Sequence, residues 1–246
     1  MNNFNRNNID HYLYQIAKNY KKQNKSGIPL EIIIVGGASI MLNYNFRNTT
    51  TDIDALIQSY SSIKEIINKV GDENNLDVGW INQDFKNTTS YSDKLYQYSN
   101  YYKTFCDCIS VRLVKDEYLI AMKMMSNRTY KKDISDIIGI IKENKEKGTP
   151  ITQEKIYKAI NNLYGDINKI PKTTLERVNN IFQYDDLEDL YYTIIEEENS
   201  NRQKLINIEK ENPNKLNEKN IDAYLKKFSI DISQNQIDVL EEKDDI

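Results

Sequence analysis

The chain has 246 residues, a formal net charge of −4 at pH 7 and a pI near 5.3. This negative balance argues against a protein that holds nucleic acid by bulk positive charge, while a local contact to one RNA stays compatible with it. The single histidine, His11, and the two cysteines, Cys106 and Cys108, are too few for histidine-based chemistry, a zinc site or a disulfide framework.

The first predicted elements are a helix, a turn and a buried strand. Apolar and aromatic side chains recur with helical spacing from Ile9 to Lys22. The segment from Lys25 to Pro29 contains Gly and Pro, which predicts a turn. The run from Ile32 to Val35 is continuous, apolar and β-branched, as is typical of a strand that is buried on both faces.

Two glycines follow this strand and predict an anion-binding turn. Gly36 and Gly37 have no Cβ, so the backbone can turn sharply there and come close to a ligand. Ala38 to Phe46 has helix-compatible spacing, and the free N–H groups of its first turn would point back at the glycines. Ser39 can cap this helix or donate its hydroxyl to a phosphate oxygen. The segment therefore predicts a cradle for a polyphosphate.

The pair Asp52 and Asp54 predicts a divalent-cation site. Alternation along a strand places both carboxylates on one face and Ile53 on the other. At a rise of about 3.3 Å per residue, the two carboxylates lie roughly 6 to 7 Å apart along the strand. At this separation they repel each other unless a cation lies between them. Mg²⁺ with a nucleoside triphosphate (NTP) is the expected occupant, with Mn²⁺ as the alternative ion, because Mg²⁺ usually takes one or two carboxylates plus substrate phosphates.

Each of these elements also has a simpler interpretation. A Gly-Gly pair after an apolar strand is often only a tight turn, and Asp-x-Asp is often a solvated strand end or a turn with capping carboxylates. Their order and separation favour the functional interpretation, since a phosphate-binding turn and a carboxylate pair one helix later are complementary halves of one site.

The middle of the chain predicts further short elements. Ser61 to Val70 has the spacing of a helix, and Leu76 to Trp80 is a candidate short strand. Ser90 to Tyr102 is polar and rich in tyrosine, and its pattern favours no single structure. Thr104 to Val114 alternates like a strand.

The segment from Val114 to Lys142 predicts two helices, divided near Thr129 and Tyr130. The first has an apolar stripe, and the second has isoleucines at i, i+3, i+4 and i+7, with Asp133 placed to cap its N-terminus. A short basic cluster lies between the stripes, and both a solvated helix end and a contact to a nucleic-acid backbone stay open for it: Arg128, Lys131 and Lys132.

The composition shifts after Lys142. Residues 143–150 form a charged linker that ends in Gly, Thr and Pro. The pattern then predicts a series of helices: Gln153 to Tyr164, Leu175 to Phe182, Leu187 to Lys210 and Ile221 to Phe228. The last residues are acidic and expected to be mobile. We therefore expect one domain over residues 1–148, followed by a helical C-terminal region with a mobile acidic tail over residues 149–246.

The glycine turn and the aspartate pair resemble the signature of the DNA polymerase β-like nucleotidyltransferase superfamily. Within it, the chain looks most like the small bacterial nucleotidyltransferases of toxin–antitoxin and abortive-infection systems. The resemblance runs from about residue 30 to about residue 142, and further segments recur in the expected order: RNTTTDID at Arg47 to Asp54, Gly79 to Asn82, and Leu119 to Lys123. The resemblance implies an α/β (α+β) fold, in which helices flank a short mixed β-sheet.

The same resemblance implies roles for residues outside the first motif. Related toxin enzymes carry a functional lysine on the first of the two helices and an aspartate on the second. These correspond to Lys123 and Asp136 here, with Asp133 as the neighbouring alternative. Lys123 would place a positive charge on a triphosphate oxygen, and Asp136 would support the metal or the lysine. A structural alternative is that Lys123 only extends from the edge of an apolar stripe and Asp133 only caps a helix.

Enzymes of this superfamily usually have a third carboxylate on a later strand, as base or metal ligand. No clear motif for it is present here. The best candidate is Asp107, which strand alternation would place on the same face as Phe105 and Ile109. Some toxin-type relatives lack this acid. Its absence would therefore weaken the hypothesis that the chain is an enzyme but would not exclude it.

The function that the resemblance implies is Mg²⁺-dependent transfer of a nucleoside monophosphate (NMP) from an NTP such as ATP to an acceptor hydroxyl. The expected acceptor is an RNA end, tRNA in particular, or a protein, and the chain would be the toxin of a type IV toxin–antitoxin pair with a cognate antitoxin. Two alternatives are a non-catalytic nucleotide- or partner-binding protein on the same fold, and a small-molecule enzyme of the aminoglycoside type. With no signal peptide and no apolar run near the ~20 residues of a bilayer span, we expect a cytoplasmic location and no membrane partner.

Overall fold

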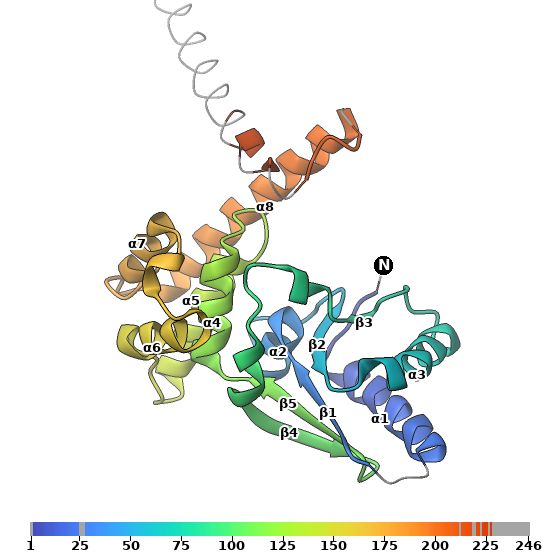
Figure 1. Cartoon of the computed structure of the whole chain (residues 1–246). Helices are drawn as coiled ribbons and strands as arrows, with labels where there is room; N and C mark the ends of the chain where they lie inside the picture. Colours follow the sequence, from blue (N-terminus) through green and yellow to red (C-terminus); the bar gives the residue numbers. More distant parts are fainter. Residues whose placement is uncertain are drawn as a thin grey trace, which may run out of the picture.

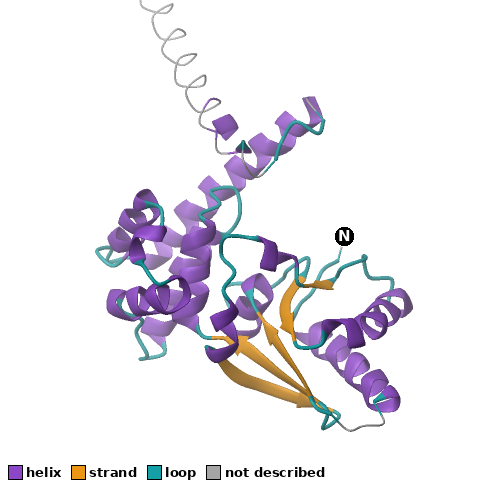
Figure 2. Ribbon diagram, viewed as in Figure 1, coloured by secondary structure: helices purple, strands orange, loops and turns teal. Residues whose placement is uncertain are grey.

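The computed structural model describes residues 2–24, 28–211, 213–217, 220–221, 223–225 and 227. Its centre is a five-stranded mixed sheet with strand order β3-β2-β1-β5-β4 (Figures 1 and 2). The strands span β1 Leu30–Ile34, β2 Ile53–Ile57, β3 Ile81–Asn82, β4 Ser99–Phe105 and β5 Ile109–Val114. Strand β1 pairs antiparallel with β2 and parallel with β5, while β4 and β5 form an antiparallel hairpin at one edge. This mixed sheet confirms the predicted fold class.

Helices cover both faces of the sheet and extend beyond it on one side (Figure 1). They span α1 Arg6–Gln23, α2 Gly36–Asn43, α3 Tyr60–Glu73, α4 Asp116–Ser126, α5 Asp133–Glu146, α6 Gln153–Tyr164, α7 Lys172–Ile181 and α8 Leu187–Glu211. Short 3₁₀ turns occupy Asp84–Asn87, Asp93–Gln97 and Ile167–Lys169. No helix in the described ranges combines the length and the apolar character that a membrane span requires.

Strand alternation decides which face each side chain occupies. Ile32 and Ile34 of β1 belong to one buried cluster with α1 and α3, whereas Ile33 belongs to a second cluster with α4 to α8. In β2, Ile53 belongs to the first cluster and Leu56 to the second. Because residues two apart share a face, the side chain of residue 54 lies on the face that α4 and α5 cover.

The predicted helix at Ala38 to Phe46 begins and ends earlier in the structure. Helix α2 starts at Gly36 and stops at Asn43, where the chain becomes extended. The backbone N–H groups of Asn45 and Phe46 donate to Glu143 Oε1 of α5 at 2.7 and 2.9 Å, which replaces intrahelical bonds. Residue 143 was assigned to a linker from the sequence, and this was wrong, because α5 continues to Glu146.

Two strand predictions were also wrong. Residues 76–80 form turns rather than a strand, and β3 follows at Ile81–Asn82. The segment from Thr104 to Val114 is not one strand, because it reverses at Cys106 and Asp107, which have positive φ angles of 50° and 54°. The helix from Gln153 to Tyr164 has the predicted ends, and the other predicted helices up to α8 are present with shifted ends. The predicted helix from Ile221 to Phe228 lies only partly within the described residues, and residues 228–246, with the expected acidic tail, lie outside them.

The N-terminal segment fastens the loop that precedes β2. Phe4 forms an isolated antiparallel bridge with Thr50, with N···O distances of 2.8 Å and 3.0 Å between the two backbones. Its side chain is 0% exposed, and its ring centroid lies 5.8 Å from that of Trp80 and 6.0 Å from that of Tyr12. This contact fixes the backbone two residues before Asp52.

Replacement of Phe4 by Ala is expected to lower the free energy of unfolding by about 3–5 kcal/mol, because a buried ring is lost and a cavity remains. Denaturant unfolding followed by circular dichroism measures this change. The exposed neighbour Asn3 provides the control, since Asn3→Ala should change the stability by no more than about 0.5 kcal/mol. An equal loss in both variants would contradict the anchoring role of the ring.

Candidate functional site

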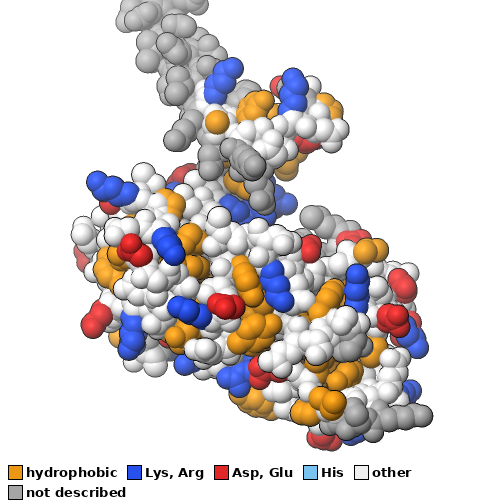
Figure 3. Space-filling view, in the orientation of Figure 1, with side chains coloured by type: hydrophobic (Ala, Val, Ile, Leu, Met, Phe, Trp, Pro, Cys, Tyr) orange, Lys and Arg blue, Asp and Glu red, His pale blue; other side chains and the backbone are white. Residues whose placement is uncertain are grey.

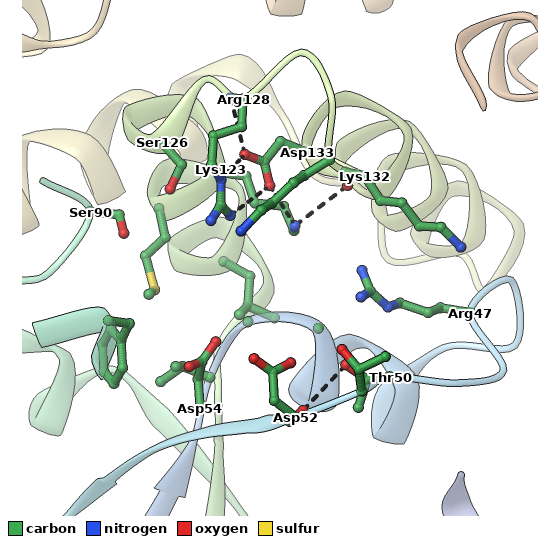
Figure 4. Close-up of a pocket in the computed structure, with 18 of the residues that line it drawn as sticks. Arg47, Thr50, Asp52, Asp54, Ser90, Lys123, Ser126, Arg128, Lys132 and Asp133 are labelled. Atoms are coloured by element: carbon green, nitrogen blue, oxygen red, sulfur yellow. Dashed lines mark hydrogen bonds and ion pairs between the residues drawn. The ribbon is translucent and has the colours of Figure 1, made fainter. Parts of the chain in front are cut away.

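A cavity of about 450 Å³ lies between the glycine turn after β1, the loop before β2, and helices α4, α5 and α8. Acidic side chains line its sheet side, and basic side chains line its helix side (Figure 4). Segments far apart in the sequence therefore meet at one hollow.

The two glycines allow close approaches that other residues would block. Gly36 has a φ of +60°, which favours glycine, and a Cβ at this position would lie 3.2 Å from Asp54 Oδ2. A Cβ on Gly37 would lie 2.4 Å from Arg47 Nη2. The missing side chains thus let a carboxylate and a guanidinium flank the start of α2, where backbone N–H groups lack intrahelical partners.

Asp52 and Asp54 both face the cavity. Both line the hollow, and neither carboxylate has a hydrogen bond or salt bridge within the part of the chain that the structure describes. Burial, followed by the negative charge of Asp52, raises the pKa of Asp54 to about 6. Two unpaired carboxylates side by side, one of them partly desolvated, are the arrangement that a divalent cation stabilises.

A network of ion pairs forms the opposite wall. Lys123 Nζ lies 3.1 Å from Asp133 Oδ1 and 2.7 Å from Asp136 Oδ2. Arg128 pairs with both oxygens of Asp133, at 2.9 and 3.1 Å, and Arg47 pairs with Asp136. Both aspartates are almost fully buried, at 1% and 2% exposed. Two acids thus hold three cations, and Lys123, Arg128 and Arg47 all line the cavity.

The charge state of this wall follows from its contacts. Burial alone would raise the pKa of Asp133, but Lys123 and Arg128 outweigh it and lower the pKa to about 2. The carboxylate is therefore ionised at neutral pH. With three cations against two anions, the cluster keeps a positive charge toward the hollow, opposite Asp52 and Asp54 (Figure 4).

Helix α8 contributes to the site from the C-terminal region. Glu198, Asn199 and Arg202 line the cavity. Glu198 accepts hydrogen bonds from the backbone N–H groups of Ile134 and Ser135 at 3.0 and 3.2 Å, so it caps the first turn of α5. In Figure 3, Lys and Arg side chains gather at the base of the α8 arm.

Most residues predicted from the sequence meet at this hollow. Gly36, Gly37, Asp52, Asp54 and Lys123 all line it. The Asp136 carboxylate contacts Lys123 and Arg47 behind the cavity wall, so it positions cations and is not placed to hold a metal with Asp52. The neighbouring alternative, Asp133, lines the cavity. The prediction that Asp133 caps α5 was wrong, because Lys132 occupies the N-cap position and Asp133 is the first residue of the helix.

Two predicted residues are not brought to the site. Ser39 is 0% exposed, and its hydroxyl lies in the core without a hydrogen-bond partner among the described residues. Asp107 lies in the turn between β4 and β5, with a side chain that is 95% exposed and 3.5 Å from Lys21. This turn is next to the start of β1, while the glycine turn follows its end, so the prediction of Asp107 as a metal ligand was wrong.

A divalent cation fits the residues that are present, although the described residues supply no third ligand. No group of three or more His, Cys, Asp or Glu side chains is placed to hold a metal within the described ranges. Mg²⁺ needs fewer protein ligands than this, because substrate phosphates and water complete its coordination. Asp52 and Asp54 are the residues that would hold it.

Several lining residues were not assigned a role from the sequence. Arg47 was present in the quoted motif, but its pairing with Asp136 depends on the meeting of the α2–β2 loop with α5. The residues of α8 carried no local signal. An apolar part of the wall was not predicted either: Phe85, Leu119 and Met122.

Comparison with known proteins agrees with this geometry. Residues 11–169 match the profile of a family described as "nucleotidyltransferase of unknown function (DUF6036)". No curated protein and no solved structure gives a significant match. The match covers well over half of the chain and includes the glycine turn, the aspartate pair and the ion-pair wall up to the end of α5. The chain therefore belongs to the DUF6036 family of nucleotidyltransferases.

Proposed function

We propose that this protein transfers an NMP from an NTP to an acceptor hydroxyl with the help of Mg²⁺. The observation that carries the proposal is the unpaired pair Asp52 and Asp54 beside a glycine turn, facing a positively charged wall. In the reaction, the acceptor oxygen bonds to the α-phosphorus while the bond to the β-phosphate oxygen breaks. Pyrophosphate leaves, and the hydroxyl proton is released.

The residues of the chain have separate tasks in this proposal. The backbone around Gly36 and Gly37 holds phosphate oxygens, and Lys123 and Arg47 neutralise the triphosphate. Asp136 keeps these two cations in place. When bound to Asp52 and Asp54, Mg²⁺ would stabilise the negative charge that develops during transfer.

The acceptor that we propose is an RNA end, tRNA in particular. Lys131, Lys132 and Arg202 line the cavity together with the three wall cations, and such a lining attracts phosphodiesters. The same lining disfavours a polycationic aminoglycoside, because like charges repel. We propose further that this modification blocks tRNA and makes the chain the toxin of a type IV toxin–antitoxin pair.

Incubation with labelled NTPs, Mg²⁺ and total RNA is expected to label RNA, and Asp52→Ala is expected to reduce the rate by at least about a hundredfold, because one of two metal-holding carboxylates is lost. Gel electrophoresis of the labelled RNA measures the transfer.

The control for this substitution is Asp107→Ala, which removes an exposed aspartate at the other end of the sheet and should leave transfer unchanged. Absence of label with every NTP, in the presence of RNA and protein extract, would support a non-catalytic binding protein. Label in a small molecule instead of RNA would support the aminoglycoside type.

The metal-free protein should show a pH-dependent stability that originates from Asp54. Its pKa is raised in the folded state from the ordinary value of 3.8 to about 6, so folding favours its protonated form. Stability from this group is present below pH 3.8 and is lost as the pH rises through about 6. Asp54→Asn should therefore unfold at a higher temperature than the wild type at about pH 7.5, and this difference should shrink below about pH 6.

Calorimetry in EDTA measures the two unfolding temperatures. Their difference cancels the contribution of the other titrating groups, which both proteins share. Added Mg²⁺ should raise the unfolding temperature of the wild type more than that of Asp54→Asn. A constant difference across this pH range would contradict the assignment.

Expression in a bacterial host is expected to arrest growth if tRNA is the acceptor, because aminoacylation requires a free tRNA end. Asp52→Ala should restore growth at an equal protein level, as measured by colony counts and immunoblotting. Equal toxicity of the two proteins would separate the arrest from nucleotidyl transfer.

A further inference from the structure

One end of the cavity is uncharged and unlike the rest. Phe85, Leu119 and Met122 give it an apolar surface, and they belong to one buried cluster. Met122 and Ser126 are four residues apart on α4, so they share a helix face. Three hydroxyl groups complete this end: Thr88, Ser90 and Ser126. We refer to these six residues as the uncharged end.

The uncharged end lies away from the phosphate-binding part. In Figure 4, Ser90 and Ser126 lie on the side of Asp54, whereas Arg47 and Lys132 lie beyond Asp52 on the other side. Phe85 is near Ser90, because Thr88 Oγ1 is 2.7 Å from the Phe85 carbonyl oxygen and 2.8 Å from Ser90 Oγ. A nucleotide with its phosphates near Arg47 would thus place its base at the uncharged end.

Neighbouring elements hold this end in place. Tyr164 of α6 donates its hydroxyl to the Ser90 carbonyl oxygen at 2.9 Å, and Ser92 Oγ donates to the Leu163 carbonyl oxygen at 2.9 Å. Both Ser90 and Ser92 are buried. The loop that carries the hydroxyls is therefore fixed to α6 and is able to discriminate between ligands that differ by one group.

The direction of the hydrogen bonds determines what the loop can offer a ligand. Thr88 has one hydroxyl proton, and its bond to the Phe85 carbonyl oxygen uses it. In the contact between Thr88 and Ser90, the donor is therefore Ser90. With both protons engaged, the oxygens of these two hydroxyls remain as acceptors. They match a ligand group that donates, such as an amino group.

We propose that the uncharged end binds the nucleobase of the NTP and prefers a base with an exocyclic amino group, adenine or cytosine, over its oxo counterpart. The ring stacks on the apolar side chains, and the amino group donates to Ser90 and Thr88. This inference rests on the proposed function and adds the class of nucleotide to it.

Two matched pairs of nucleotides test the preference, because ATP differs from inosine triphosphate (ITP), and CTP from UTP, mainly by an amino group in place of an oxo group. Isothermal titration calorimetry of the full chain with Mg²⁺ measures each affinity, with inorganic tripolyphosphate as the probe without a base. We expect ATP or CTP to bind at least about tenfold tighter than its partner, because a carbonyl could accept from Ser90 only if that hydroxyl gave up its hydrogen bond to Thr88.

Two variants separate the contribution of the amino-group contact from that of ring stacking. Ser90→Ala should reduce the ratio within each pair to near one, and Phe85→Leu should weaken the binding of NTPs by about tenfold through lost stacking. Neither should change the affinity for tripolyphosphate, which lacks a base. Ser61→Ala, an exposed serine of α3, is the matched control and should behave as the wild type. A cooperative unfolding transition above the assay temperature establishes that each variant folds.

The outcomes distinguish this inference from the proposed function. If tripolyphosphate binds and NTPs bind no tighter, the base site is wrong and the phosphate site stands. If each pair binds equally in the wild type, or if Ser90→Ala keeps the ratio, the amino preference is wrong. If neither tripolyphosphate nor any NTP binds, the proposed function and this inference both fail.

Discussion

The site depends on two buried carboxylates at the start of α5. Asp133 and Asp136 lie in the first turn of this helix, where the helix dipole favours negative charge, and together they hold Lys123, Arg128 and Arg47. A buried charge without a partner is costly, so each acid must keep its cations and each cation its acid. This requirement fixes three positive groups along the cavity and leaves Asp52 and Asp54 as the cavity-lining acids without a partner among the described residues.

Helix α8 stabilises the same turn from outside the matched family segment. Glu198 accepts two backbone N–H bonds from the start of α5 and lies 2.5 Å from Ser135 Oγ. Burial raises the pKa of Glu198 to about 7, and these hydrogen bonds oppose the rise. The α8 cap therefore links the C-terminal region to the ion-pair wall, and Asn199 and Arg202 extend that wall.

The parts of the site that could be predicted are those set by local patterns. The β-branched strand, the glycine turn and the alternation of Asp52 and Asp54 depend on neighbours in sequence, and the structure brings them together. Most helices followed from their apolar periodicity. The end of α2 did not, because the N–H groups of Asn45 and Phe46, just after this helix, bond to Glu143, about a hundred residues away. Likewise, the chain reverses at Asp107 because Cys106 and Asp107 have positive φ angles. The alternation of apolar and polar residues in the sequence does not reveal these angles.

The sequence by itself determined the buried strand, the glycine turn and the carboxylate pair, because strand and helix periodicity and the absence of Cβ act within a few residues. The resemblance to a known superfamily added the fold class. Only the tertiary structure decided the rest. It paired Arg47 with Asp136, brought Glu198 onto α5 and joined Ser90 to Tyr164 of α6. These contacts join segments that are distant in the chain, and their partners are selected by packing and by the cost of burying unpaired polar groups.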